Sequence, residues 1–63
     1  MFIKYRNVNL GDELYEPGGY FGLVRQIKGN KLLVDSFGKR KSKLTWISKR
    51  DIKQSFMTIW RYT

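Results

Sequence analysis

Positive charge is concentrated in residues 37–51, FGKRKSKLTWISKRD, where cationic side chains surround one tryptophan. Ammonium and guanidinium groups bind phosphate oxygens, and several of them on one surface are typical of a nucleic-acid-binding protein. The same clustering also suits a solvated loop whose charges only prevent aggregation. The candidate phosphate-binding residues in this segment are Lys39, Arg40, Lys41, Lys43, Lys49 and Arg50.

Aromatic residues add a second kind of candidate. Tyr20 and Phe21 lie in the glycine-rich stretch PGGYFG, where side chains usually face solvent, and flat rings beside cations stack on bases. Both join the candidate site, as does Arg25 near a predicted hairpin, although Phe21 also suits an apolar lid over the core. Trp46 alternates with Leu44 on a predicted strand, so we expect Trp46 in the core. Three further lysines could extend the surface: Lys28, Lys31 and Lys53.

Catalysis finds little support in the composition. The chain has no cysteine and no histidine, so the commonest nucleophile–base pairs and the usual zinc ligands are missing. The five acids are Asp12, Glu13, Glu16, Asp35 and Asp51, and their spacing matches no calcium loop. We expect Asp12, Glu13 and Glu16 to be solvated carboxylates. The sequence therefore predicts a protein that is not an enzyme and needs no metal or cofactor.

The overall charge and length narrow the class of protein. A formal charge of +8, from 13 basic and 5 acidic residues among 63, predicts attraction to DNA, RNA or an acidic protein. This length predicts a single domain, residues 1–63. No apolar run approaches the roughly 20 residues of a membrane span, and the N-terminal stretch lacks the pattern of a secretion signal. We expect a soluble cytoplasmic protein without a membrane partner.

Strand signals dominate the segments that must position these residues. The stretches between the glycines are short and rich in β-branched and aromatic residues, which predicts an all-β fold. The strands are expected at residues 12–16, 23–28, 31–37, 43–48 and 55–63, with an irregular loop at 17–22. Five short strands in so small a chain favour a closed barrel, because closure removes the edge strands.

Local signals refine three of the connections. Gly29-Asn30 separates two apolar runs and predicts a tight hairpin, because both residues tolerate the left-handed conformation of a primed turn. Val24 and Ile27 are three residues apart, so a β-bulge near Arg25 must bring both to one face. Residues 48–52 predict one helical turn that begins at a serine cap.

A set of residues in 10–36 follows a known order: a Gly-Asp pair, a glycine-rich stretch, a Gly-x-Val-x-x-Ile run and a hairpin that ends in valine. The matching residues are Gly11-Asp12, Gly18–Phe21, Gly22–Ile27, Gly29-Asn30 and Val34. This order resembles the KOW motif of ribosomal proteins and transcription elongation factors. The resemblance implies a small five-stranded SH3-like barrel with one short helical turn before the last strand, and it implies RNA binding.

These observations favour a non-enzymatic protein that contacts the phosphate backbone of DNA or RNA. An alternative is a small basic interaction module, an inhibitor or adaptor of viral or mobile-element type, that docks on an acidic protein partner. A third class is a structural subunit. The C-terminal segment has apolar residues on both faces, so Trp60 there could mediate a homo-oligomer.

Overall fold

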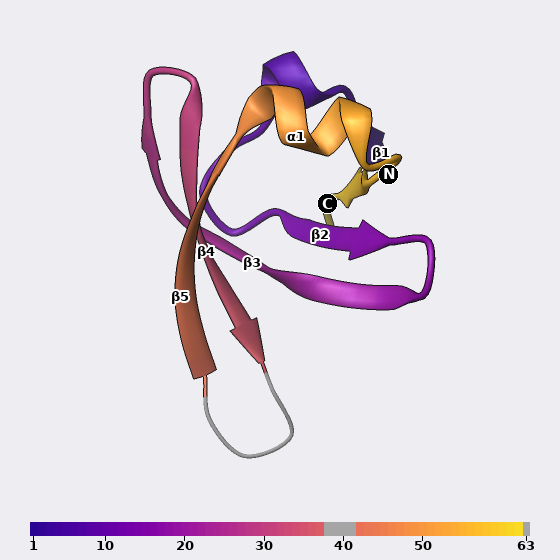
Figure 1. The fold of residues 1–63 in the computed structure, drawn as a ribbon. Coiled ribbons are helices and arrows are strands. Elements are labelled where there is room, and N and C mark those ends of the chain that lie inside the picture. Colours follow the sequence, from indigo (N-terminus) through magenta and orange to yellow (C-terminus); the bar gives the residue numbers. More distant parts are fainter. Residues whose placement is uncertain (38–41, 63) are drawn as a thin grey trace.

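The computed structural model describes residues 1–37 and 42–62, which form an antiparallel β-sheet with a short helix (Figure 1). Its elements are β1 (Phe2–Ile3), η1 (Tyr5–Asn7), β2 (Glu13–Glu16), β3 (Gly19–Lys28), β4 (Lys31–Phe37), β5 (Ser42–Ser48), α1 (Lys49–Gln54) and β6 (Thr58–Trp60). The strand order is β1-β6-β2-β3-β4-β5. The all-β class with one short helix is therefore confirmed.

The number of strands differs from the prediction. The described residues contain six strands instead of five, in an open sheet whose edges are β1 and β5. β1 was missed because only its pairing with the far end of the chain makes it a strand: Phe2 lies opposite Trp60, and Ile3 lies opposite Ile59. The two ends of the chain consequently lie next to each other (Figure 1).

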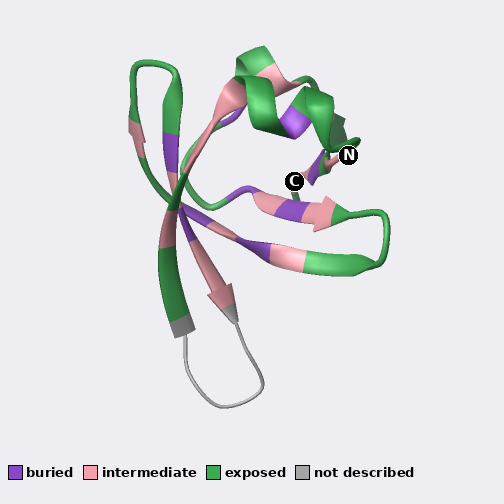
Figure 2. Cartoon of the chain, in the orientation of Figure 1, coloured by how far each residue is buried: buried purple, intermediate pink, exposed green. Residues whose placement is uncertain are grey.

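The core lies between one face of this sheet and α1. Burial is concentrated on β2, β3, β4, β6 and α1, while the tips of the β2–β3 and β3–β4 hairpins are exposed (Figure 2). The buried apolar residues are Val8, Leu14, Val24, Leu32, Val34, Ile52 and Ile59. Because Ile52 is the buried residue of α1, the opposite side of that helix faces solvent.

The β3–β4 hairpin confirms two predictions. Gly29-Asn30 connects the strands, with Lys28 opposite Lys31, although only Gly29 of the two turn residues has a positive φ (56°). The pairing shifts register between Val24 and Gln26, as the predicted bulge requires. Val24 is buried, and Ile27 packs against the same core.

The stretch PGGYFG is not the irregular loop that its glycines predicted. β3 already begins at Gly19, and only Pro17 and Gly18 form the turn that follows β2. The strand continues because Gly19 adopts φ 141° and Gly22 permits a close approach to β4. A Cβ atom at Gly22 would lie 2.6 Å from the Asp35 carbonyl oxygen, so no larger residue fits this bend without a shift of backbone.

The C-terminal third contains one confirmed and two wrong predictions. Ser48 caps α1 as expected. The final strand is shorter than residues 55–63, because α1 extends to Gln54 and β6 spans only Thr58–Trp60. Trp46 is 46% exposed and is not a core residue. On β5 it is Ile47, the neighbour on the other face, that packs against the core. Among the described residues no helix is long and apolar enough to span a membrane.

Candidate nucleic-acid interface

A broad, open depression lies where α1 and η1 meet, and its volume is about 940 Å³. We call it the basic depression, because its described lining includes cations and no acid. Its residues are Tyr5, Arg6, Asn30, Ser48, Lys49, Arg50, Lys53, Gln54 and Phe56. The segments that build it are far apart in sequence, and Figure 1 shows α1 and η1 side by side.

A capping box fixes the start of α1 and with it the cations of the helix. The Ser48 hydroxyl accepts a hydrogen bond from the Asp51 N–H (3.1 Å), and the Asp51 carboxylate accepts one from the Ser48 N–H (3.0 Å). The Lys49 N–H donates to the Asn30 carbonyl (2.7 Å), which joins the helix to the β3–β4 turn. Residues three and four apart share a helix face, so Lys49 and Arg50 lie on the same side of α1 as Lys53.

The second wall of the depression comes from η1. Arg6 Nε donates a hydrogen bond to the Tyr5 hydroxyl (3.3 Å), and the guanidinium carbon lies 5.7 Å from the centre of the Tyr5 ring. The hydrogen bond from Arg6, the positive charge of Arg6 and, more weakly, that of Lys53 lower the pKa of Tyr5. Arg6 of η1 and the cations of α1 therefore line one continuous depression.

The cations of the basic depression have no acidic partner among the described residues. In residues 1–37 and 42–62 the single ion pair joins Arg61 to Asp12, away from this surface. Asp51, the acid nearest in sequence, is engaged in the helix cap. The basic depression thus combines cations that have no acidic partner with aromatic rings, an arrangement suited to phosphates and bases.

The predicted phosphate-binding residues fall into separate places. Lys49 and Arg50 lie in the basic depression. Lys43 lies near the other end of β5, opposite Ser36, and five residues of extended strand put it about 17 Å from Ser48. Arg25, at the bulge, lines a different depression of about 530 Å³. The predicted residues Lys39, Arg40 and Lys41 lie outside the described residues.

The predicted aromatic candidates also separate from the basic depression. Tyr20 lies on the outer face of the sheet, where its ring packs edge-to-face on Tyr15 (5.3 Å between centres). Burial, followed by the charge of Glu13, raises the pKa of Tyr20. Phe21 packs against the core, which agrees with its predicted alternative role as an apolar lid.

Of the charged and aromatic residues that line the depression, three were not predicted to bind nucleic acid: Tyr5, Arg6 and Phe56. Tyr5 and Arg6 come from a segment that carries no strand or helix signal, and only the tertiary fold brings it to α1. The one available signal was the alternation of cations and aromatic rings in KYR at residues 4–6.

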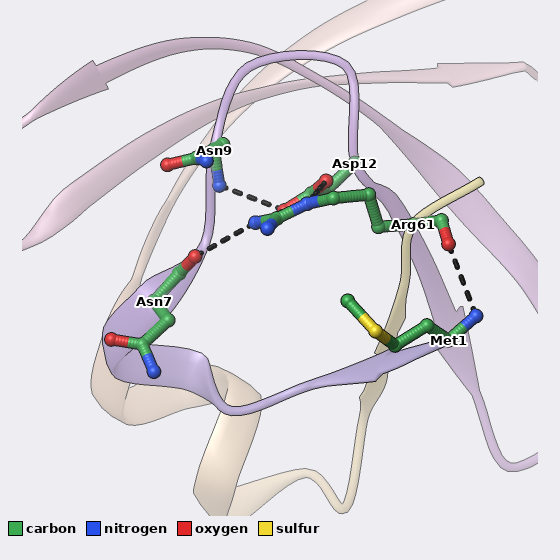
Figure 3. Close-up of polar contacts among 5 residues, drawn as sticks. All are labelled: Met1, Asn7, Asn9, Asp12 and Arg61. Carbon is green, nitrogen blue, oxygen red and sulfur yellow. Dashed lines mark hydrogen bonds and ion pairs between the residues drawn. The ribbon is translucent and has the colours of Figure 1, made fainter. Parts of the chain in front are cut away.

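Asp12 is not a solvated acid, contrary to the prediction, because it is only 1% exposed. Its carboxylate accepts two hydrogen bonds from the guanidinium of Arg61, at 2.7 and 2.8 Å, and one from the Asn9 N–H at 2.8 Å (Figure 3). Arg61 also donates to the Asn7 carbonyl (2.9 Å), and its own carbonyl accepts from the Met1 amino group (3.0 Å). Burial opposes ionisation of Asp12, but the bonds from Arg61 and Asn9 outweigh it and lower the pKa of Asp12. We call this arrangement the Asp12–Arg61 lock.

A separate surface, formed mainly by aromatic side chains, lies on the outer face of the sheet at β1, β6 and β2. Trp60 packs edge-to-face against both Phe2 (4.9 Å between centres) and Tyr62 (6.2 Å). With Tyr15 and Thr58, these rings line an open hollow of about 390 Å³. We call it the aromatic hollow, and among the described residues no cation lines it.

Comparison of the chain with protein-family models, with curated proteins and with solved structures finds no match.

Proposed function

We propose that the protein is a non-enzymatic nucleic-acid-binding protein that contacts the phosphate backbone through its basic depression. The observation that supports this proposal is the convergence of four cations on one open surface whose described lining contains no acid: Arg6, Lys49, Arg50 and Lys53. Exposed cations without an ion-pair partner attract phosphates and release counterions when they bind them. Lys39, Arg40, Lys41 and Lys43 would add a second point of contact in this proposal.

The same proposal includes the finer fold and family assignment. The resemblance to the KOW motif and the bulged, bent sheet favour an SH3-like barrel, with α1 over the open side of the sheet. Proteins with this motif contact RNA, which agrees with a backbone-directed function. Because one fold serves many functions, the charge of the basic depression is the stronger support.

Charge reversal tests the proposal. We expect the wild-type protein to bind a 12-nucleotide strand or a 12-base-pair duplex at low salt. The logarithm of affinity should fall with the logarithm of salt concentration with a slope of about −3 for four neutralised phosphates. The double variant Arg50→Glu/Lys53→Glu should lose at least about tenfold in affinity. The double variant Arg25→Glu/Lys28→Glu is the matched control, because it reverses two exposed cations that lie outside the basic depression.

Absence of binding at about 20–50 mM salt would overturn the proposal, because contacts between cations and phosphates are strongest at low salt. Equal losses of affinity in Arg50→Glu/Lys53→Glu and in Arg25→Glu/Lys28→Glu would show that net charge matters and that the basic depression does not.

A second candidate function, protein interaction, is favoured by a different observation. Phe2 and Tyr62 are mostly exposed beside Trp60, and aromatic residues are enriched in protein–protein interfaces. Sedimentation velocity tests self-association through this surface. A concentration-dependent dimer that Trp60→Ser abolishes would support it, and a monomer at all concentrations would exclude a homo-oligomer.

A further inference from the structure

Phe56 combines two properties that seldom occur together in an aromatic residue. Its side chain is 81% exposed, and its backbone has φ 55°. Among the described residues it is the only one other than glycine with a positive φ. A bulky residue in this region is an outlier that calls for an explanation in terms of function or strain.

The hydrogen bonds around Phe56 show why the backbone adopts this conformation. The Phe56 N–H donates to the Lys53 carbonyl (3.3 Å), and the Met57 N–H donates to the Ile52 carbonyl (2.9 Å). This is a Schellman motif, in which the residue after the helix cap must be left-handed and is usually glycine or asparagine. Met57 packs on the core that contains Ile52, which completes the motif. The end of α1 therefore needs a left-handed residue, and the chain has phenylalanine there.

Burial of the side chain does not offset the cost of a left-handed phenylalanine at position 56. A phenylalanine in the core would be retained for its buried area, but the Phe56 ring is almost fully in water. The stability of the domain would be served better by glycine at this position. Phe56 instead lines the basic depression, as Lys53 and Tyr5 do.

We infer that Phe56 is a stacking platform for an unpaired base, so that the ligand of the basic depression is a single-stranded nucleic acid. The inference rests on the proposed function and specifies its ligand. In a duplex the faces of the bases are covered by their neighbours, and an exposed ring gains nothing from them without unstacking. In a single strand the bases are free to stack on an aromatic ring while Arg50 and Lys53 hold the adjacent phosphates.

The test compares fluorescently labelled 12-nucleotide oligo(dT), oligo(rU) and a 12-base-pair duplex by anisotropy. We expect Phe56→Gly to reduce affinity for the two single strands by about 5- to 150-fold, which corresponds to one lost stacking contact. Affinity for the duplex should stay unchanged. Phe56→Leu is the matched control for the ring, because it keeps an apolar side chain at the left-handed position and should lose the same single-strand affinity.

Thermal unfolding separates this role from a structural one. Glycine adopts the left-handed backbone conformation without strain, so the Tm of Phe56→Gly should be about 4–8 °C higher than that of the wild type. Stability and binding should therefore change in opposite directions. A lower Tm would show that the ring stabilises the fold, which would overturn the inference.

Failure of the stacking inference and failure of the proposed function give different results in this experiment. If Phe56→Gly binds oligo(dT) and oligo(rU) as tightly as the wild type while Arg50→Glu/Lys53→Glu loses binding, the stacking inference is wrong and the proposed function stands. Preference of the wild type for the duplex would overturn the inference in the same way. If the wild type binds none of the three probes at low salt, the proposed function itself fails.

Discussion

The Asp12–Arg61 lock and the basic depression use the same cationic chemistry in opposite ways. In the lock, Arg61 donates to a nearly fully buried carboxylate and to a backbone carbonyl, and it joins the two ends of the chain. In the basic depression, Lys49 and Arg50 have no ion-pair partner among the described residues. The role of a cation in this protein therefore depends on its partner and its burial, and it does not depend on its neighbours in the sequence.

Removal of the lock's cation should produce the largest effect. Arg61→Ala leaves the Asp12 carboxylate buried without its guanidinium partner, and an uncompensated buried charge strongly destabilises a fold. We expect the Tm to fall by about 10 °C or more in thermal unfolding followed by circular dichroism. Asp12→Asn is the control that removes the charge and keeps the shape, so its Tm should fall less.

The matched change in the basic depression should leave stability almost unaltered. Arg50→Ala removes an exposed cation without an ion-pair partner, and we expect a Tm within about 4 °C of the wild type. A loss as large as that of Arg61→Ala would remove the distinction between the two regions.

Acid should destabilise the fold through the lock. The pKa of Asp12 is lowered in the folded protein, so the folded state favours the ionised carboxylate. The contribution of Asp12 to stability is then complete above its unfolded pKa, about 3.9, and is lost as the pH falls through the lower folded pKa. The Tm of the wild type should therefore decrease below about pH 4 more steeply than that of Asp12→Asn. Parallel curves would contradict this assignment.

The cap that positions the depression should have a smaller effect. Ser48→Ala removes the oxygen that accepts from the Asp51 N–H and should cost about 1 kcal/mol in the free energy of unfolding by urea. Because the cap orients Lys49 and Arg50, nucleic-acid affinity should also fall, by a few-fold. Ser48→Asp retains a capping acceptor and should restore most of the stability.

Sequence reasoning succeeded where local chemistry decides the structure. The hairpin at Gly29-Asn30, the bulge beside Arg25 and the Ser48 cap all depend on residues close together in the chain, and all are present. Asp12 and Trp46 were assigned wrongly because their environments depend on distant segments. Asp12 is buried through a partner 49 residues away, and Trp46 is on the exposed face of β5.

For the same reason, only part of the basic depression could be predicted from the sequence. Lys49 and Arg50 belong to a cationic segment that can be read from the sequence, but Arg6 reaches them only through the packing of η1 against α1. Clustering in sequence also grouped Lys43 with these residues, although an extended strand separates it from them. Phe56 was read as part of a strand, because nothing in its local sequence marks a left-handed residue.

We propose that the basic depression is the surface that binds nucleic acid. Titration of the ¹⁵N-labelled protein with 12-nucleotide oligo(dT), followed by two-dimensional ¹H–¹⁵N NMR, shows which residues the ligand contacts. The largest shift changes should occur at residues 5–6, 30 and 48–56, with little change at the aromatic hollow around Trp60. Shift changes concentrated at residues 2, 15 and 58–62, or absent throughout the titration, would contradict it.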